Sequence, residues 1–234
     1  MDPHTLKALN AARAARQAAV LVTDLQSGRD RLVREGEGVA GALGEAISAR
    51  LRSGKAGAEM IEGTEFFLNP YRPEPRLVLI GAVHISQALA PMARACGLAV
   101  TVIDPRTAFA TPERFGDVDL VAEWPDEAIA KRPLDPHTAL AALTHDPKID
   151  DGPLLAALEA NCFYVGALGS RKTHAARRER LGQAGATEDM LERIEAPIGL
   201  DIGAASPPEI AVAVLGSVIR ALRAPRTSRA ARAA

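Results

Sequence analysis

The chain has 234 residues, of which 47% are hydrophobic and 24% are charged, and its formal net charge is -1. That length suits one large domain or two small ones, and the apolar content is enough for a packed core, which excludes a disordered protein. The balanced charge gives no reason to expect nucleic acid or an acidic membrane as a partner.

The cysteines and the N-terminus restrict the class of protein further. Cys96 and Cys162 are too few for a disulfide framework or a zinc site, so we expect both to be buried as small apolar side chains. The N-terminus lacks a basic segment followed by an apolar one, and no apolar run reaches membrane-spanning length. We therefore expect a cytoplasmic protein that does not bind a membrane.

The first third of the chain mixes helical and strand patterns. We expect helices at 6–18 and 39–52, and strands at 18–25, 31–33 and 65–68. This pattern predicts a small α+β N-terminal domain over residues 1–72, in which we find no catalytic motif. The segment 69–75 contains three prolines and is turn-prone, so we place the domain boundary there.

The stretch 76–90 opens the second part of the chain with a strand, a turn and a helix. Residues 77–80 are an unbroken apolar run, Gly81 ends it, and apolar residues then recur at helical spacing. This is the pattern that opens a dinucleotide-binding unit. Against the G-x-G-x-x-G pattern, however, Val83 and Ser86 replace the second and third glycines. Val83 places a branched side chain where a backbone must approach a pyrophosphate, which disfavours ordinary NAD(P) binding.

Further apolar runs and helical patterns alternate down to residue 223. We expect strands at 98–103, 119–123, 138–144 and 162–165, and helices at 125–131, 152–159, 172–180 and from Pro207 onward. Strands that alternate with helices predict an α/β fold, here a Rossmann-like parallel-sheet domain over residues 73–223. The remaining residues, 224–234, are predicted to be a flexible basic tail.

Polar residues follow several of these strands, where ligands bind in open parallel sheets. Asp104 stands where such folds hydrogen-bond a ribose hydroxyl, although a strand-end aspartate also caps loops, and Arg106 suits a phosphate. His84 lies in the first turn, as a ligand contact or a surface histidine. His145 and Asp146 end another strand, as a site or as a structural pair. No third partner completes a nucleophilic triad, and His84 with His145 gives too few ligands for a metal.

A second glycine-rich turn spans residues 166–172. Gly166, Gly169, Ser170 and Arg171 lie in this turn, which leads into a strongly basic helix at 172–180. The free N–H groups of a helix start, supplemented by Arg171, make an anion site on physical grounds. We interpret the basic residues farther along that helix, Arg177, Arg178 and Arg180, as a solvated face.

Five segments of the chain match a known family in order and approximate spacing. They are G-A-V-H-I-S at 81–86, V-I-D-P-R at 102–106, L-T-H-D at 143–146, Y-V-G-A-L-G-S-R-K at 164–172 and P-I-G-L-D-I-G-A-A-S-P-P-E-I-A at 197–211. Together they resemble the XdhC/CoxI family, whose members are accessory proteins of molybdenum hydroxylases such as xanthine dehydrogenase and carbon monoxide dehydrogenase. The match covers residues 76–223. The family usually has glycine where this chain has Val83, and many members carry an N-terminal cysteine that 39–45 lacks.

The resemblance implies a carrier of molybdenum cofactor, a pterin (molybdopterin) with a phosphate. Such a carrier protects the cofactor during sulfuration and insertion into the hydroxylase apo-enzyme, works with a cysteine desulfurase, and forms a homodimer. It needs no catalytic residue, and an NAD(P)-dependent oxidoreductase remains the alternative. The candidate cofactor-binding residues are Gly81, Ala82, His84, Ser86, Asp104, Arg106, His145, Asp146, Gly166, Gly169, Ser170 and Arg171.

Overall fold

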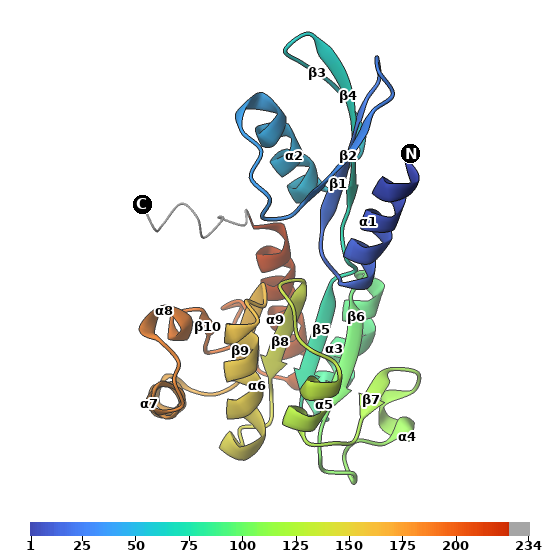
Figure 1. The fold of residues 1–234 in the computed structure, drawn as a ribbon. Helices are drawn as coiled ribbons and strands as arrows, with labels where there is room; N and C mark the ends of the chain where they lie inside the picture. Colours follow the sequence, from blue (N-terminus) through green and yellow to red (C-terminus); the bar gives the residue numbers. More distant parts are fainter. Residues whose placement is uncertain (225–234) are drawn as a thin grey trace. The chain divides into compact units, whose positions relative to one another are not determined.

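The computed structural model describes residues 1–224 and contains two compact units, Met1–Pro73 and Glu74–Leu222 (Figure 1). The division of the chain into domains at 1–72 and 73–223 stays a prediction. Nearly all of the predicted basic tail, from residue 225 onward, lies outside the described residues.

The first unit is a four-stranded antiparallel sheet with two helices. Its strands lie in the order β2-β1-β4-β3. Their bounds are β1 Ala19–Asp24, β2 Asp30–Arg34, β3 Gly57–Ile61 and β4 Thr64–Tyr71, and the helices are α1 Pro3–Ala14 and α2 Gly41–Ser53. Strand β3 was not predicted, because four of its five residues have side chains that are not buried and it carries no apolar pattern. It is held by antiparallel pairing with β4.

The second unit is a six-stranded parallel sheet in the order β10-β9-β8-β5-β6-β7. The strands are β5 Arg76–Ile80, β6 Ala99–Ile103, β7 Asp119–Val121, β8 Thr138–Ala142, β9 Tyr164–Ala167 and β10 Ile194–Glu195. Helices lie on both faces of this sheet in Figure 1. The predicted α/β class with a Rossmann-like sheet is therefore confirmed.

Burial on both faces explains the unbroken apolar runs. Along β5, Leu77 and Leu79 pack into one core cluster with helices α3 His84–Ala95 and α9 Pro207–Arg223. Val78 and Ile80 alternate with them and pack into a second cluster with α6 Pro147–Glu159 and its neighbours. A strand covered on both faces needs apolar side chains at every position, which removes the polar alternation of a one-sided sheet.

Several boundaries differ from the sequence predictions. Helix α6 begins at Pro147 and not at residue 152, because Asp146 caps it and Pro147 suits the first helical position. Strand β9 begins at Tyr164 and not at residue 162. The short helices α4 Pro112–Phe115 and α8 Glu188–Leu191, and the two-residue strand β10, were not predicted. Helices α5 Pro125–Lys131 and α7 Arg171–Gln183 lie close to their predicted ranges.

The two cysteines differ in environment. Cys162 is buried, as predicted, and burial raises the pKa of its thiol to about 12. The prediction for Cys96 is wrong, because it lies exposed at the C-terminal end of α3. Within residues 1–224, none of the helices combines the length and the apolar character needed to cross a membrane.

We predict opposite stability changes at two glycines. Gly81 has φ +112°, and a Cβ built there would lie 2.7 Å from Thr144 Cγ2, so Gly81→Ala should lower the free energy of unfolding by about 1–3 kcal/mol. Gly182 lies in the last turn of α7, and apart from the adjoining backbone of its own helix no atom lies within 4 Å of its Cβ position, so Gly182→Ala should raise the free energy of unfolding by about 0.5–1 kcal/mol. Urea unfolding of the wild type and both variants measures these free energies. Changes of the same sign in the two variants would contradict the prediction.

Candidate functional site at the carboxyl ends of the strands

The strand order reverses direction between β5 and β8. From β5 the chain moves outward through β6 and β7, and it then returns to β8 on the other side of β5. Ligands of open α/β sheets bind at such a point, outside the carboxyl ends of the strands. Gly81 follows β5 and Thr144 lies just after β8, and the missing side chain of Gly81 leaves room for the Thr144 methyl group. The two turns therefore pack against each other at this edge.

Asp104 connects the end of β6 to the turn after β5. Its buried carboxylate accepts hydrogen bonds from Ala82 N at 2.7 Å and from three nitrogens of Arg106, namely N at 2.9 Å, Nε at 2.9 Å and Nη2 at 2.7 Å. Burial raises the pKa of Asp104, but the hydrogen bonds from Arg106 and Ala82 outweigh it and leave the pKa below its ordinary value. Four donors fill the four acceptor positions of a carboxylate. A ribose hydroxyl would have to displace one of them.

A cation-rich stack covers the loop after β6. The Arg106 guanidinium lies 4.8 Å from the centre of the Phe109 ring, and that of Arg114 lies 5.9 Å from it. Arg114 also donates to Ala82 O at 3.0 Å and to Gln87 Oε1 at 2.9 Å. Arg114, from the unpredicted helix α4, thus fixes the turn after β5 from the outside.

In the turn after β5, one of the remaining predicted residues is buried and another is accessible. Ser86 is fully buried, and its hydroxyl donates to the Gly81 carbonyl oxygen. It closes the turn and does not face outward. His84 is exposed at the first position of α3, and no side chain caps that helix within the described residues. His84 and the free N–H groups near it are the accessible part of this turn.

A buried carboxylate that the sequence analysis missed holds the turn after β8. Asp150 accepts from Thr144 Oγ1 at 2.8 Å and from His145 N at 3.0 Å. Burial raises its pKa to about 6, although these hydrogen bonds oppose the shift. His145 is exposed with φ +66°, and Asp146 accepts from Lys148 N as the cap of α6. The Asp146–Pro147 pair, a helix-start signal, would have placed Asp150 on α6.

The two glycines of the second glycine-rich turn have different tasks. A Cβ at Gly166 would lie 2.6 Å from Tyr164 Oη and 2.7 Å from Ile198 Cγ1, so Gly166 serves close packing. Gly169 has φ +134° and precedes Ser170, whose hydroxyl accepts from Thr173 N as the cap of α7. Arg171 is exposed at the first position of that helix.

The interpretation of the basic run in α7 as a solvated face is wrong. Arg177 is only 2% exposed and donates to Leu168 O at 2.8 Å. Arg178 pairs with Glu188, and Arg180 pairs with Asp151 at 2.6 Å. Basic residues in a helix look solvated in sequence, but here each finds an acceptor from a different element of the fold.

The predicted residues meet in two groups along one edge. In the first group, the ends of β6 and β8 lie on either side of the end of β5, and the charges of Asp146 and Asp150 add to the effect of Asp104 in raising the pKa of Arg106. The second group is the turn 168–171 and Arg177, and Asp150 also acts on Arg177. The edge presents guanidinium, imidazole and amide groups, a set that suits an anion with polar ring atoms.

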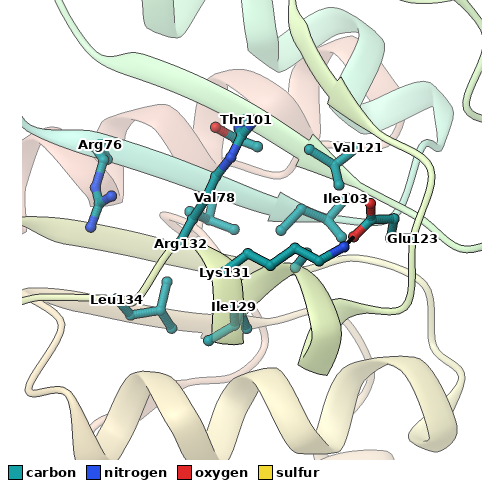
Figure 2. Close-up of a pocket in the computed structure, with 11 residues that line it drawn as sticks. Arg76, Val78, Thr101, Ile103, Val121, Glu123, Ile129, Lys131, Arg132 and Leu134 are labelled. Carbon is teal, nitrogen blue, oxygen red and sulfur yellow. Dashed lines mark hydrogen bonds and ion pairs between the residues drawn. The ribbon is translucent and has the colours of Figure 1, made fainter.

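A cavity of about 100 Å³ lies elsewhere, between the sheet and α5 (Figure 2). Its floor is apolar, with Val78, Ile103 and Ile129 among the lining residues. The charged groups around it form ion pairs, Lys131 with Glu123 at 2.7 Å, Arg132 with Asp119 at 2.6 Å and Arg76 with Asp135 at 2.9 Å. Its lining contains none of the predicted site residues, so the cavity is separate from the candidate site.

Comparison with known proteins gives one family. Residues 77–218 match the model of the XdhC Rossmann domain, which is more than half of the chain. The chain belongs to the XdhC family. All five motifs at the carboxyl edge and in α9 fall within or overlap this match, so the family resemblance seen in the sequence is confirmed.

Three similar proteins illustrate the family. A protein of Bacillus subtilis, named as a probable xanthine dehydrogenase subunit, is 33% identical over 158 residues, covering 67% of this chain and 46% of that protein. The molybdenum cofactor insertion chaperone PaoD of Escherichia coli is 32% identical over 148 residues, covering 63% of this chain and 40% of that protein. A crystal structure described as a xanthine dehydrogenase from Bacillus halodurans has a TM-score of 0.63 at 25% identity, covering 96% of this chain and 65% of that one. The chain thus spans less than half the length of these two curated relatives.

We predict that Asp150 makes the stability of this XdhC chain fall as the pH rises. Its pKa is 3.8 in the unfolded chain and about 6 in the fold, so the folded state holds more protons between those values. The free energy of unfolding should therefore decrease between about pH 4 and 6, by at most about 3 kcal/mol for this group.

Denaturant unfolding across that pH range checks the prediction. Asp150→Asn should remove this contribution and flatten the profile relative to the wild type. Asp151→Asn, which removes the neighbouring carboxylate and leaves Asp150 in place, is the matched control and should retain the decrease that Asp150 causes. Identical slopes for wild type and Asp150→Asn would show that Asp150 does not titrate in this range.

Proposed function

We propose that this chain binds molybdenum cofactor at the carboxyl edge of its parallel sheet and delivers it to a molybdenum hydroxylase. The family membership supports a maturation role, since one relative is named as a molybdenum cofactor insertion chaperone. The chemistry of the edge supports the same ligand class. Molybdopterin is a polar heterocycle with a phosphate, and the edge offers cationic and amide donors.

The observation that carries the proposal is the start of α7. This helix has 13 residues, and its first turn follows a glycine turn at the carboxyl end of β9. Its amide N–H groups and positive dipole end favour an anion, and the exposed Arg171 adds a guanidinium at that point. We place the phosphate of the cofactor there, beside Gly169, Ser170 and Arg171.

The pterin ring is proposed to lie toward the switch point. His84, Arg106, His145 and Asp146 would contact its polar edge, because they are the accessible polar groups after β5, β6 and β8. Gly81, Ala82, Ser86, Asp104 and Gly166 would act indirectly, since their contacts fix the turns. This division refines the role that we assign to each predicted residue.

The alternative, an NAD(P)-dependent oxidoreductase, fits these contacts less well. The acceptor positions of Asp104 are occupied by Arg106 and Ala82, and the Ala82 N–H is not free for a pyrophosphate. Val83, the N-cap of α3, keeps a branched side chain at the approach to that helix. We therefore favour cofactor transport, in which this chain makes and breaks no covalent bond.

The proposal includes partners and context. The hydroxylase apo-enzyme, such as xanthine dehydrogenase or carbon monoxide dehydrogenase, would receive the cofactor. A cysteine desulfurase would sulfurate it while it is bound, and the carrier would work as a homodimer in the cytoplasm. Support for these finer statements comes from the family resemblance and not from contacts of this chain.

Retention of cofactor through gel filtration tests the site. We expect Arg171→Ala to lower the pterin and molybdenum that stay with the protein by about tenfold, since a charge-assisted contact to an anion contributes about 1.5–3 kcal/mol. Arg94→Ala is the matched control. This variant also removes an exposed arginine, but Arg94 lies in the last turn of α3, away from the carboxyl edge, and pairs with Asp117.

Two results would contradict the proposed site. Equal retention by Arg171→Ala and wild type would remove Arg171 from it. A thermal shift of the wild-type chain by NAD or NADP, with none by molybdenum cofactor, would favour the oxidoreductase.

A further inference from the structure

We infer that Arg177 and His174 form the buried floor of an oxyanion site beneath the turn 168–170. This inference deepens the proposed function, because the oxyanion that we expect is the phosphate of the cofactor. It adds two residues that the sequence analysis did not single out as ligands. The turn and the start of α7 would form the upper part of the same site.

Arg177 has hydrogen-bonding capacity that the described residues do not use. Its side chain is 2% exposed, and Nη2 donates to Leu168 O at 2.8 Å. Its Nε and Nη1 are buried and have no hydrogen-bond partner among residues 1–224. A buried charged donor without a partner is destabilising, and such groups in native proteins are usually satisfied by water, an ion or a ligand.

The acidic residues near Arg177 are engaged elsewhere. Asp150 and Asp151 both act on its charge, yet burial dominates and lowers the pKa of Arg177. Asp151 forms its ion pair with Arg180. The carboxylate of Asp150 accepts hydrogen bonds from Thr144 and His145. Neither carboxylate accepts a hydrogen bond from Arg177, so its Nε and Nη1 lack an acceptor among the described residues.

His174 adds a third unsatisfied nitrogen, on the same face of α7 as Arg177. Its Nδ1 is buried without a partner in the described part of the chain. Residues three apart on a helix are neighbours, so His174 lies next to Arg177. Burial, followed by the charges of Arg177 and Arg178, lowers the pKa of His174. A neutral imidazole can carry its proton on Nδ1 and donate from it.

The guanidinium of Arg177 lies next to the turn that precedes α7. A Cβ built on Gly169 would be 3.8 Å from Arg177 Nη2 and 3.3 Å from the Thr173 side chain. The guanidinium is therefore immediately below the turn whose upper side carries the helix N–H groups and Arg171. A site formed by a guanidinium, an imidazole N–H and amide N–H groups suits an oxyanion and rejects a cation.

Binding requires the turn to move. The unpartnered nitrogens have no contact with solvent in this closed form, and the Leu168 carbonyl oxygen occupies Nη2. An incoming anion would replace that carbonyl and accept from Nη2 together with Nε or Nη1. Gly169, with φ +134°, allows a backbone conformation there that other residues rarely adopt.

Inorganic phosphate is the probe, added to the full chain free of pterin at constant ionic strength. We expect a saturable shift of the Arg177 Nε–H resonance in nitrogen-15 NMR, and a phosphate-dependent rise of the melting temperature. Arg177→Lys should weaken phosphate binding at least about tenfold, because the fixed fork of donors is lost. Arg178→Lys is the matched control, one residue away and paired with Glu188, and should bind within about twofold of the wild type.

Two outcomes would overturn the inference. In the first, saturating phosphate does not shift the Arg177 Nε–H resonance, which is the result expected if a permanently bound water satisfies the guanidinium. If Arg177→Lys does not fold, this NMR result by itself decides whether the inference holds. The other is equal phosphate affinity in wild type and a folded Arg177→Lys. Phosphate binding through Arg177 without any retention of molybdenum cofactor would instead keep the inference and contradict the proposed function.

Discussion

The hydrogen bonds of Asp104 organise the edge where we place the site. This carboxylate joins the end of β6 to the Ala82 N–H in the turn after β5, and it orients the guanidinium of Arg106. In a dinucleotide-binding protein an acidic residue at this place binds the ribose. Here its acceptors are filled by the protein, so the same fold position shapes a binding edge for a different guest. The Thr144 methyl group, packed against Gly81, tightens the edge from the β8 side.

Two buried charges perform the corresponding task farther along the sheet. The Asp150 carboxylate holds the turn after β8 by accepting from the Thr144 hydroxyl and the His145 N–H, and Arg177 holds the turn after β9 by donating to the Leu168 carbonyl oxygen. Both carboxylate oxygens of Asp150 accept hydrogen bonds from the protein, whereas Nε and Nη1 of Arg177 have no partner among the described residues. We therefore assign Asp150 a structural role, and Arg177 retains the capacity to donate to a ligand. It also explains why the proposed anion lies nearer to α7 than to α3.

The sequence predicts the fold well because a strand buried on both faces is recognised by an unbroken run of apolar residues. The run at 77–80 is apolar throughout, and β5 lies where that run predicts. Long-range contacts leave no such pattern. Arg177 looks like one of several helix arginines in the sequence, but in the structure it is buried, donates to the Leu168 carbonyl oxygen and feels the charge of Asp150 from another helix. Asp104 is correctly placed at a strand end, but its saturation by Arg106 and Ala82 follows from the way the turn folds back.

Native mass spectrometry of the chain, purified from cells that make molybdenum cofactor, tests the central claim most directly. The claim is that the carboxyl edge carries an anionic pterin as cargo. It predicts a complex with one molybdopterin for each chain, and release of that pterin when the complex is dissociated. A chain that carries NAD or NADP in place of the pterin, from the same cells, would contradict it.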